Sequence, residues 1–333
     1  MIFQNIDFHN VEEMEAAGGG YRMCRIPHHV RGQLNERIRE TSAWYSTGVE
    51  LRFRILGDRA RIHLYVQPSE EAQVAYIYYG SFQGGWRYSS KIIGEAETVI
   101  EIPRPENLNA LWRITKEKGL HFSPEIVRIV LPYGTCIYVG TEGDVAPPAE
   151  GETPAGTYLA YGSSITHGSL ALAAPYAYPF RIANKFKCDY INLGFAGSAH
   201  LEEAMAEYIV SRKDWNFASV EMGINMLGED FDECLFEERV DRFTEILAGD
   251  TRPVFATDIF THYPSDKGKL EKSGKYREIV KKYAGRRLVF TEGKELSGDV
   301  SLISQDLTHP SLEGMETIVN NWYAVMKAAG MAD

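Results

Sequence analysis

The sequence of 333 residues lacks the features that mark several classes of protein. No apolar run approaches the roughly 20 residues that a transmembrane helix needs. Residues 1–20 are acidic and polar, without the basic and then apolar pattern of a signal peptide. We therefore expect a cytoplasmic protein that does not insert into a membrane.

Cysteine is rare. The residues Cys24, Cys136, Cys188 and Cys234 lie far apart, without the paired spacing of a metal site. We expect them to be small buried thiols, because free cysteine behaves as a small apolar side chain. The sequence therefore predicts neither a metal nor a cofactor.

A basic surplus is also absent. Residues 1–140 contain 16 basic and 16 acidic side chains, so the formal net charge of −11 falls wholly within residues 141–333. An acidic surface repels nucleic acid and anionic membranes, and we exclude both as partners. The same charge would repel a polyanionic substrate.

Residues 1–140 alternate apolar and polar side chains over many short segments. The alternation is clearest at 49–57 and 59–66, which Gly57-Asp58 would join as a β-hairpin. So many short strands with almost no helix predict an all-β domain, a β-sandwich of the jelly-roll kind. Further strands are expected at 72–80, 98–103, 110–115 and 125–132.

The pattern changes after residue 140. Residues 141–156 are rich in proline, glycine and glutamate, which is typical of a linker. In residues 157–333, short apolar segments alternate with amphipathic ones, which predicts a parallel sheet with helices on both faces. Strands are expected at 157–161, 190–193, 219–222, 253–257 and 288–291, and helices at 176–186, 201–211, 232–247, 267–283 and 311–328.

Polar motifs follow several of these strands. The first three strands end in or just before YGSSITHG (161–168), NLGFAGS (192–198) and EMGINM (221–226). A fourth motif, DLTHP (306–310), precedes the last helix. Ligands of doubly wound sheets bind at the carboxyl ends of the strands, so we expect all four motifs to meet at one edge.

The four motifs contain the groups that acyl transfer from a serine requires. The serine needs a base, the base needs an orienting group, and the oxyanion needs hydrogen-bond donors. His309 can be the base, and Asp306, three residues earlier, can reach its Nδ1 atom. The donors available are the backbone N–H groups of Ser164 and Gly197 and the side-chain amide of Asn225.

The order Gly-x-Ser-Ile-Thr, a later glycine, Gly-x-Asn and Asp-x-x-His resembles the SGNH (GDSL-type) hydrolases, over residues 157 to about 328. Those enzymes hydrolyse esters on a flavodoxin-like three-layer fold without a metal. The resemblance implies that Ser164 is the nucleophile, His309 the base and Asp306 its partner. It also implies an oxyanion hole made by Ser164, Gly197 and Asn225.

Two positions depart from the pattern of that family. Ser163 stands where the family usually has aspartate, which removes a negative charge near the oxyanion. Met226 stands where aspartate often follows Gly-x-Asn, which makes the floor of the site more apolar. Because two serines are adjacent, Ser163 is also an alternative nucleophile to Ser164.

Four residues near these motifs could line a substrate pocket: Ser163, His167, Met226 and His200. Both histidines have a second interpretation. His167 lies only three residues beyond Ser164 and could be a polar group at a helix start. His200 could be an exposed side chain of the loop after the second strand.

Together these features predict a serine esterase that cleaves short acyl esters, above all acetyl esters, of a sugar or oligosaccharide. The β-sandwich before the hydrolase segment resembles the two-domain branch of the family, which contains carbohydrate O-acetyl esterases. No long apolar segment is available to cover a fatty chain. One alternative is an acyltransferase with the same triad and an acceptor other than water, and another is a carbohydrate-binding protein without activity. The sequence leaves homo-oligomer formation open.

Overall fold

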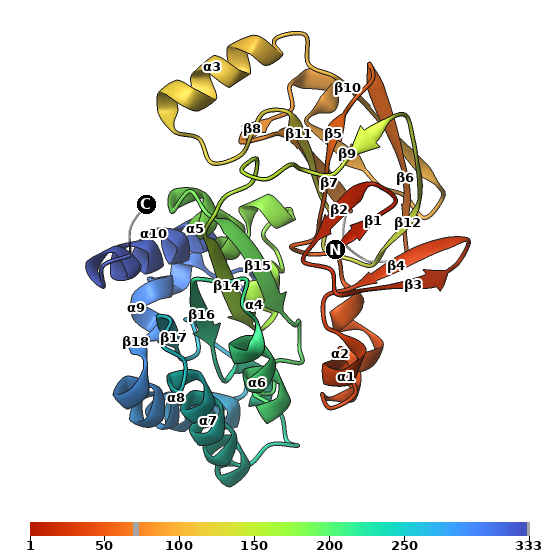
Figure 1. The fold of residues 1–333 in the computed structure, drawn as a ribbon. Helices are drawn as coiled ribbons and strands as arrows, with labels where there is room; N and C mark the ends of the chain where they lie inside the picture. The colour runs from red at the N-terminus through yellow and green to blue at the C-terminus, as the bar shows by residue number, and fades with distance from the viewer. Residues whose placement is uncertain (69–72, 332–333) are drawn as a thin grey trace.

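The computed structural model describes residues 1–68 and 73–331. Two antiparallel sheets make up the first half of the chain, and a parallel sheet with helices makes up the second (Figure 1). This is the predicted fold class, a β-sandwich followed by an α/β domain. The last strand of the sandwich ends at residue 146 and the first parallel strand begins at residue 157.

The sandwich consists of two antiparallel sheets. One has the order β1-β2-β5-β11-β7-β8, with β13 beside β5 and β9 beside β7, and the other has the order β10-β6-β12-β4-β3. Its strands are β1 (Ile2–Phe3), β2 (Ile6–His9), β3 (Glu13–Ala17), β4 (Gly20–Cys24), β5 (Glu50–Ile55), β6 (Arg59–Val66), β7 (Val74–Tyr79), β8 (Phe82–Gln83), β9 (Ser90–Ile92), β10 (Thr98–Pro103), β11 (Ile126–Val130), β12 (Cys136–Glu142) and β13 (Val145–Ala146). A short η2 turn (Trp86–Tyr88) precedes β9.

The predicted hairpin at Gly57-Asp58 is wrong. Strand β5 pairs with β2 and β11 in one sheet, whereas β6 pairs with β10 and β12 in the other. Phe53 of β5 and Leu64 of β6 belong to the same buried cluster and meet across the core. Alternation of apolar and polar residues identifies the buried face of a strand, but it does not identify the strand's neighbours. Two consecutive strands bury the same residues whether they pair in one sheet or face each other across the core.

Residues 110–115 are not a strand but part of helix α3 (Leu108–Lys118). The half-buried and buried side chains of Leu108, Leu111 and Thr115 are spaced by three and four residues, which is the period of a helix. The helix ends at Gly119, whose φ of 59° and N–H bond to the carbonyl of Thr115 form a left-handed cap.

The α/β domain has a parallel sheet in the order β15-β14-β16-β17-β18, which is the flavodoxin-like order 2-1-3-4-5. Helices α6, α7 and α8 cover one face, and α5, α9 and α10 cover the other. The elements are β14 (Thr157–Gly162), α4 (Ser164–His167), η3 (Ala174–Tyr176), α5 (Tyr178–Lys185), β15 (Asp189–Gly194), α6 (Glu203–Ser211), β16 (Phe217–Glu221), η4 (Ile224–Met226), α7 (Glu233–Ala248), β17 (Val254–Thr257), α8 (Lys267–Arg287), β18 (Val289–Thr291), α9 (Gly293–Ser297), η5 (Val300–Leu302) and α10 (Leu312–Ala328). Within the described ranges, no helix has the combined length and apolarity that crossing a bilayer demands.

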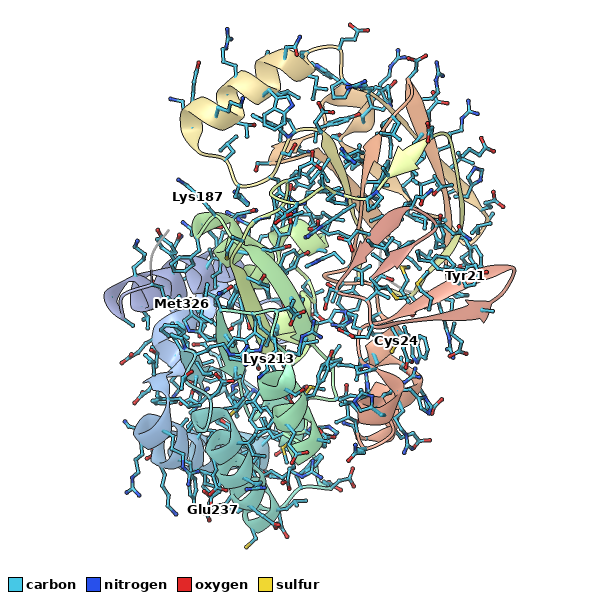
Figure 2. The ribbon with its side chains drawn as sticks, in the orientation of Figure 1. Tyr21, Cys24, Lys187, Lys213, Glu237 and Met326 are labelled. Carbon is cyan, nitrogen blue, oxygen red and sulfur yellow. The ribbon has the colours of Figure 1, made fainter. Side chains whose placement is uncertain are left out.

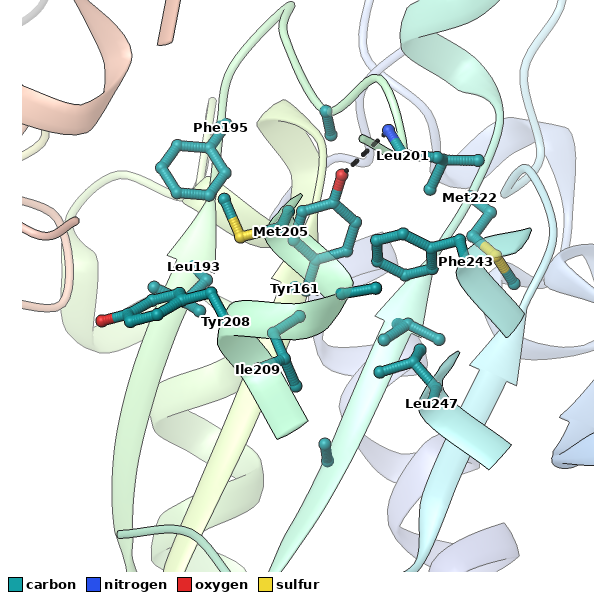
Figure 3. Packing of buried hydrophobic residues seen from close by; sticks show 14 of the residues in the cluster. Tyr161, Leu193, Phe195, Leu201, Met205, Tyr208, Ile209, Met222, Phe243 and Leu247 are labelled. Carbon is teal, nitrogen blue, oxygen red and sulfur yellow. Dashed lines mark hydrogen bonds between the residues drawn. The ribbon is translucent and has the colours of Figure 1, made fainter. Parts of the chain in front are cut away.

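Tyr161, near the end of β14, lies within the buried hydrophobic cluster between the parallel sheet and helices α6, α7 and α8 (Figure 3). Its ring packs against Phe243 of α7, with ring centroids 5.1 Å apart. Its hydroxyl oxygen accepts a hydrogen bond of 3.2 Å from the backbone N–H of Leu201. The strand that leads to Ser164 is thereby tied to the loop that follows β15.

A short helical segment of the first half also packs against the α/β domain. It comprises α1 (His28–Arg31), α2 (Glu36–Glu40) and η1 (Ser42–Trp44), and it lies beside α6 in Figure 1. Its apolar residues Leu34 and Ile38, together with Ile26 just before the segment, share a buried cluster with Met205 of α6. Figure 2 labels Cys24, the last residue of β4, shortly before this segment.

Charged side chains are buried where the two halves meet. Arg52 of β5 donates two hydrogen bonds, of 2.6 and 2.7 Å, to the carboxylate of Asp189 at the start of β15. Glu50 accepts from Arg52 at 2.9 Å and from Arg128 at 2.7 and 2.6 Å. Burial alone would raise the pKa of Glu50, but Arg128 and Arg52 lower it to about 2, so the carboxylate is ionised.

We predict that Asp189→Asn strongly destabilises the protein. Breaking one partner out of a buried ion pair costs about 3–5 kcal/mol, because the other charge stays buried and unpaired. The new amide would also point N–H donors at the donors of Arg52. Urea unfolding at pH 7 measures the change.

The matched control is Glu203→Gln, which also neutralises a carboxylate paired with an arginine, but at a half-exposed site. Exposed pairs contribute little, so this variant should unfold close to the wild type. Equal stability of both variants would contradict the role of the buried pair.

Candidate active site

Ser164 is the first residue of α4, at the carboxyl end of β14. The Ser163 hydroxyl oxygen caps this short helix by accepting from the N–H of Ile165 at 3.2 Å. The Ser164 side chain is partly exposed, and its Oγ lies 2.7 Å from Nε2 of His309. The two adjacent serines therefore have different environments, and Ser164 is the one that meets a base.

His309 is oriented by Asp306. The Nδ1–H group of His309 donates to Oδ2 of Asp306 at 2.5 Å, which leaves Nε2 to accept from the Ser164 hydroxyl. Oδ1 of Asp306 accepts from the backbone N–H groups of Thr308 and His309 at 2.9 Å and from the Ser304 hydroxyl at 2.6 Å. Partial burial opposes ionisation, but the bonds from Ser304 and His309 outweigh it and hold the pKa of Asp306 well below its usual range.

Three hydrogen-bond donors lie around the cavity that Ser164 and His309 line. Oδ1 of Asn225 accepts from the backbone N–H of Ala199 at 3.1 Å, so the amide NH₂ group is the part of Asn225 that stays available. The backbone N–H groups of Ser164 and Gly197 donate to no acceptor among the described residues. Ser164, Gly197 and Asn225, the three residues predicted to form an oxyanion hole, all line the cavity.

Gly223 determines where Asn225 is placed. Its φ of 117° is a conformation that side chains rarely adopt, and a Cβ atom there would lie 2.9 Å from Cγ1 of Ile259. Only glycine therefore permits the turn from β16 into η4.

The cavity has a volume of about 470 Å³ and receives residues from both halves of the chain. Arg37 and Tyr133 come from the first half. The lining that comes from the second half is Ser164, Ser169, Ala196, Gly197, Ile224, Asn225, Leu227, Gly228, His262, Pro264, Lys269, Thr308 and His309.

The four predicted pocket residues lie outside this lining, so that expectation is corrected. Ser163, His167 and Met226 are almost completely buried. The imidazole of His167 contacts the carbonyl of Gly194 at 3.1 Å, and burial lowers its pKa well below the usual value. His200 packs its ring against the loop after η4. These side chains support the walls of the site and do not face the cavity.

Glu221, at the end of β16, is the first residue of the motif EMGINM, and the sequence analysis assigned it no role. It accepts from the backbone N–H and the hydroxyl of Ser163, each at 2.8 Å, and from the hydroxyl of Thr166 at 3.0 Å. Burial raises the pKa of Glu221, while the bonds from Ser163 and Thr166 lower it. Because β16 lies beside β14, a carboxylate at the end of one strand reaches the turn after the other.

The first half of the chain supports the loops of the site. Arg25, which is buried, donates to the carbonyls of Asn192 and Gly194 at 2.8 and 3.0 Å, just before the loop that contains Gly197. Thr47 donates to the carbonyl of His167 at 2.7 Å. The sequence contained no motif that would identify these supports.

The chain is similar in sequence and in fold to several known proteins. Residues 157–218 match the sequence model of the GDSL-like Lipase/Acylhydrolase family, and no curated protein matches the chain. Salicylyl-acyltransferase SsfX3, from a tetracycline biosynthetic pathway, is 15% identical with a TM-score of 0.73, over 98% of this chain and 95% of that one.

Two family two carbohydrate esterases also match. The enzyme from Cellvibrio japonicus is 11% identical with a TM-score of 0.60, over 98% of this chain and 95% of that one. The enzyme from Clostridium thermocellum, solved in complex with cellohexaose, is 13% identical with a TM-score of 0.56, over 84% and 91%.

The family match over residues 157–218 confirms the resemblance to the SGNH (GDSL-type) hydrolases and supports the predicted class of enzyme, an esterase. At these identities the solved structures show a shared fold, a β-sandwich followed by the α/β domain.

We predict that Glu221→Ala slows the reaction of Ser164 with a fluorophosphonate. The variant leaves the Ser163 N–H group and two hydroxyls without their acceptor in a buried place, which costs about 1–3 kcal/mol for each unsatisfied group. The turn that carries Ser164 should therefore shift. The labelling rate and the free energy of unfolding are the two measurements.

Glu207→Ala is the control, because Glu207 is an exposed carboxylate on α6. It should change neither measurement. Wild-type labelling by Glu221→Ala would show that Glu221 does not position Ser164.

Proposed function

We propose that the protein is a serine esterase with Ser164 as nucleophile, His309 as base and Asp306 as the group that orients the base. The observation that carries the proposal is the continuous chain of hydrogen bonds from Ser164 through His309 to Asp306, at 2.7 and 2.5 Å. Its serine end opens into a cavity with unused N–H donors.

In the first half of the reaction, Nε2 of His309 takes the proton of the Ser164 hydroxyl as Oγ attacks the ester carbonyl. The resulting oxyanion accepts from the backbone N–H groups of Ser164 and Gly197 and from the amide of Asn225. Donors held in place before the reaction stabilise this charge without reorganising. The intermediate then expels the alcohol, which takes its proton from His309.

In the second half, a water molecule attacks the acyl group on Ser164 while His309 takes a proton from the water. The acid leaves as Oγ of Ser164 recovers that proton. Throughout, the carboxylate of Asp306 stabilises the imidazolium that forms on His309. A negative charge on Glu221 acts in the same direction.

We propose an acetylated sugar or short oligosaccharide as the substrate. Family two carbohydrate esterases share the arrangement of sandwich and α/β domain, and one of them was solved with cellohexaose. His262 supports a substrate with hydroxyl groups, because it lines the cavity and its buried Nε2 has no partner among the described residues. A cytoplasmic location, as expected from the sequence, would suit oligosaccharides that the cell has already imported.

An acyltransferase is the second candidate. The observation that favours it is the likeness to salicylyl-acyltransferase SsfX3 over almost the whole chain. The two reactions share every step up to the acyl-enzyme and differ in the acceptor. Product analysis with and without sugar alcohols distinguishes them, because transfer yields a new ester whereas hydrolysis yields only the free acid.

We predict that Ser164→Ala and His309→Ala each lower kcat for p-nitrophenyl acetate by about 10⁴-fold or more, since the members of a triad act as a unit. Asp306→Ala should cost less. Ser163→Ala is the discriminating control, because its hydroxyl faces Glu221 and not His309. If Ser163→Ala abolished the reaction and Ser164→Ala did not, the nucleophile would be the other serine.

We predict that kcat/KM falls along the series of p-nitrophenyl acetate, butyrate and octanoate. The polar side chains of Ser169, His262 and Thr308 line the cavity together with the apolar Ile224 and Leu227, and an acyl chain longer than this small apolar surface can cover would leave apolar area in water. Initial rates on the three esters, each divided by its spontaneous rate, give the comparison. A preference for octanoate would overturn the short-chain assignment.

A further inference from the structure

Arg37 lies directly over the loop that supplies an oxyanion donor. A Cβ atom built on Gly197 would lie 2.8 Å from Cζ of Arg37 and 3.0 and 3.1 Å from its two Nη atoms. The guanidinium group therefore covers the Cα of Gly197, and Arg37 lines the same cavity as Ser164. It belongs to α2, in the half of the chain that precedes the hydrolase segment.

The position of Arg37 is fixed by the start of its helix. Asn35 caps α2, its Oδ1 accepting from the N–H of Ile38 at 3.1 Å. The NH₂ group of Asn35 donates to the carbonyl of Ser198 at 2.9 Å and to Glu202 at 2.6 Å. Helix α2 is thus attached to the residue next to Gly197, and Arg37, two residues beyond Asn35, is held over the site.

The guanidinium group of Arg37 has no polar partner within the described part of the protein. Among the described residues it forms no ion pair and no side-chain hydrogen bond, although this chain pairs many of its arginines with carboxylates. Arg37 also lines an adjoining cavity of about 610 Å³, so space remains on its far side.

The charge of the catalytic cavity is opposite to that of the surrounding domain. Arg37 and Lys269 line it, and no aspartate or glutamate does so among the described residues. The acidic surplus of residues 141–333, which argued against a polyanionic substrate, therefore does not extend into the cavity. A planar, permanently charged fork of N–H donors over Gly197, in the cavity that Ser164 lines, matches a carboxylate.

We propose that Arg37 is a specificity-determining residue that selects an ester carrying a carboxylate, on either the acyl or the alcohol part of the substrate. This inference rests on the proposed esterase function and narrows its substrate to anionic esters. The carboxylate accepts hydrogen bonds from the Arg37 guanidinium while the carbonyl oxygen occupies the donors of Ser164, Gly197 and Asn225. In a uronic acid that is acylated on one of its hydroxyl groups, the alcohol part carries the carboxylate. In a half-ester of a dicarboxylic acid, the acyl part carries it.

Two matched pairs of substrates test the proposal and distinguish these sources. The acyl pair is p-nitrophenyl hemiglutarate and p-nitrophenyl pentanoate, and the alcohol pair is an acetylated methyl glucuronoside and the corresponding acetylated methyl glucoside. Hydrogen bonds to a charged group are worth roughly a factor of 10 to 100, so wild type should favour the anionic member of one pair by that factor in kcat/KM.

Arg37→Gln should reduce that preference to near one. Arg39→Gln is the matched control, because Arg39 lies on the same helix and lines neither cavity, and it should retain the preference. A wild type without preference in both pairs, or a preference that survives Arg37→Gln, overturns the assignment.

Measurements of ligand binding test the role of Arg37 independently of whether the protein is an esterase. Calorimetry on Ser164→Ala, with and without Arg37→Gln, measures the dissociation constants of hemiglutarate ester and glucuronoside without turnover. A tenfold or greater weakening by Arg37→Gln for one of these ligands supports the subsite even if hydrolysis is absent. No dependence on Arg37 for either ligand overturns it, whereas full hydrolysis by Ser164→Ala would refute only the nucleophile.

Discussion

The buried ion pair between Arg52 and Asp189 is the contact on which the arrangement of the molecule depends. Removing two charges from water costs several kcal/mol per ion, and only close, complete hydrogen bonding returns that free energy. Here Asp189 receives both arms of the guanidinium, and Glu50 takes the remaining Nε–H of Arg52 together with Arg128. A small rotation of the sandwich on the parallel sheet would leave one of these charges buried and unpaired. We infer that the network permits one docking geometry.

Because that geometry is fixed, the sandwich half can contribute to the site as a rigid body. Arg25 holds the carbonyls at the end of β15, and Thr47 holds the end of α4. Asn35 attaches α2 to the loop that contains Gly197, which places Arg37 in the cavity. The first half is therefore part of the structure around the site, and Arg25, Thr47 and Asn35 each donate to backbone carbonyl groups close to Ser164 or Gly197. A side chain that donates to a backbone carbonyl holds a loop in place without restricting the side chains of that loop, because every residue has a carbonyl group.

The sequence was most informative where chemistry and periodicity coincide. Strands followed by glycine-rich polar motifs predicted the edge at which Ser164, Asn225 and His309 meet, because parallel strands end at one side of a sheet. It was least informative about partners distant in the chain. Alternation at β5 and β6 identified their buried faces but not the sheet of each strand. Arg37 lies on a helix of five residues without a motif, and only the folded chain brings it to Gly197.

The serine at position 163 is explained by Glu221. The usual aspartate of the family would place a carboxylate directly before Ser164, and serine at this position removes that carboxylate. The structure retains a carboxylate there, because Glu221 reaches from the neighbouring strand and binds the N–H and hydroxyl of Ser163. Two carboxylates so close, in a fully buried place, would repel one another and one would hold a proton. A small neutral residue at 163 is therefore the complement of an acid at 221, and the pair keeps one carboxyl group beside Ser164 while moving it to the end of β16.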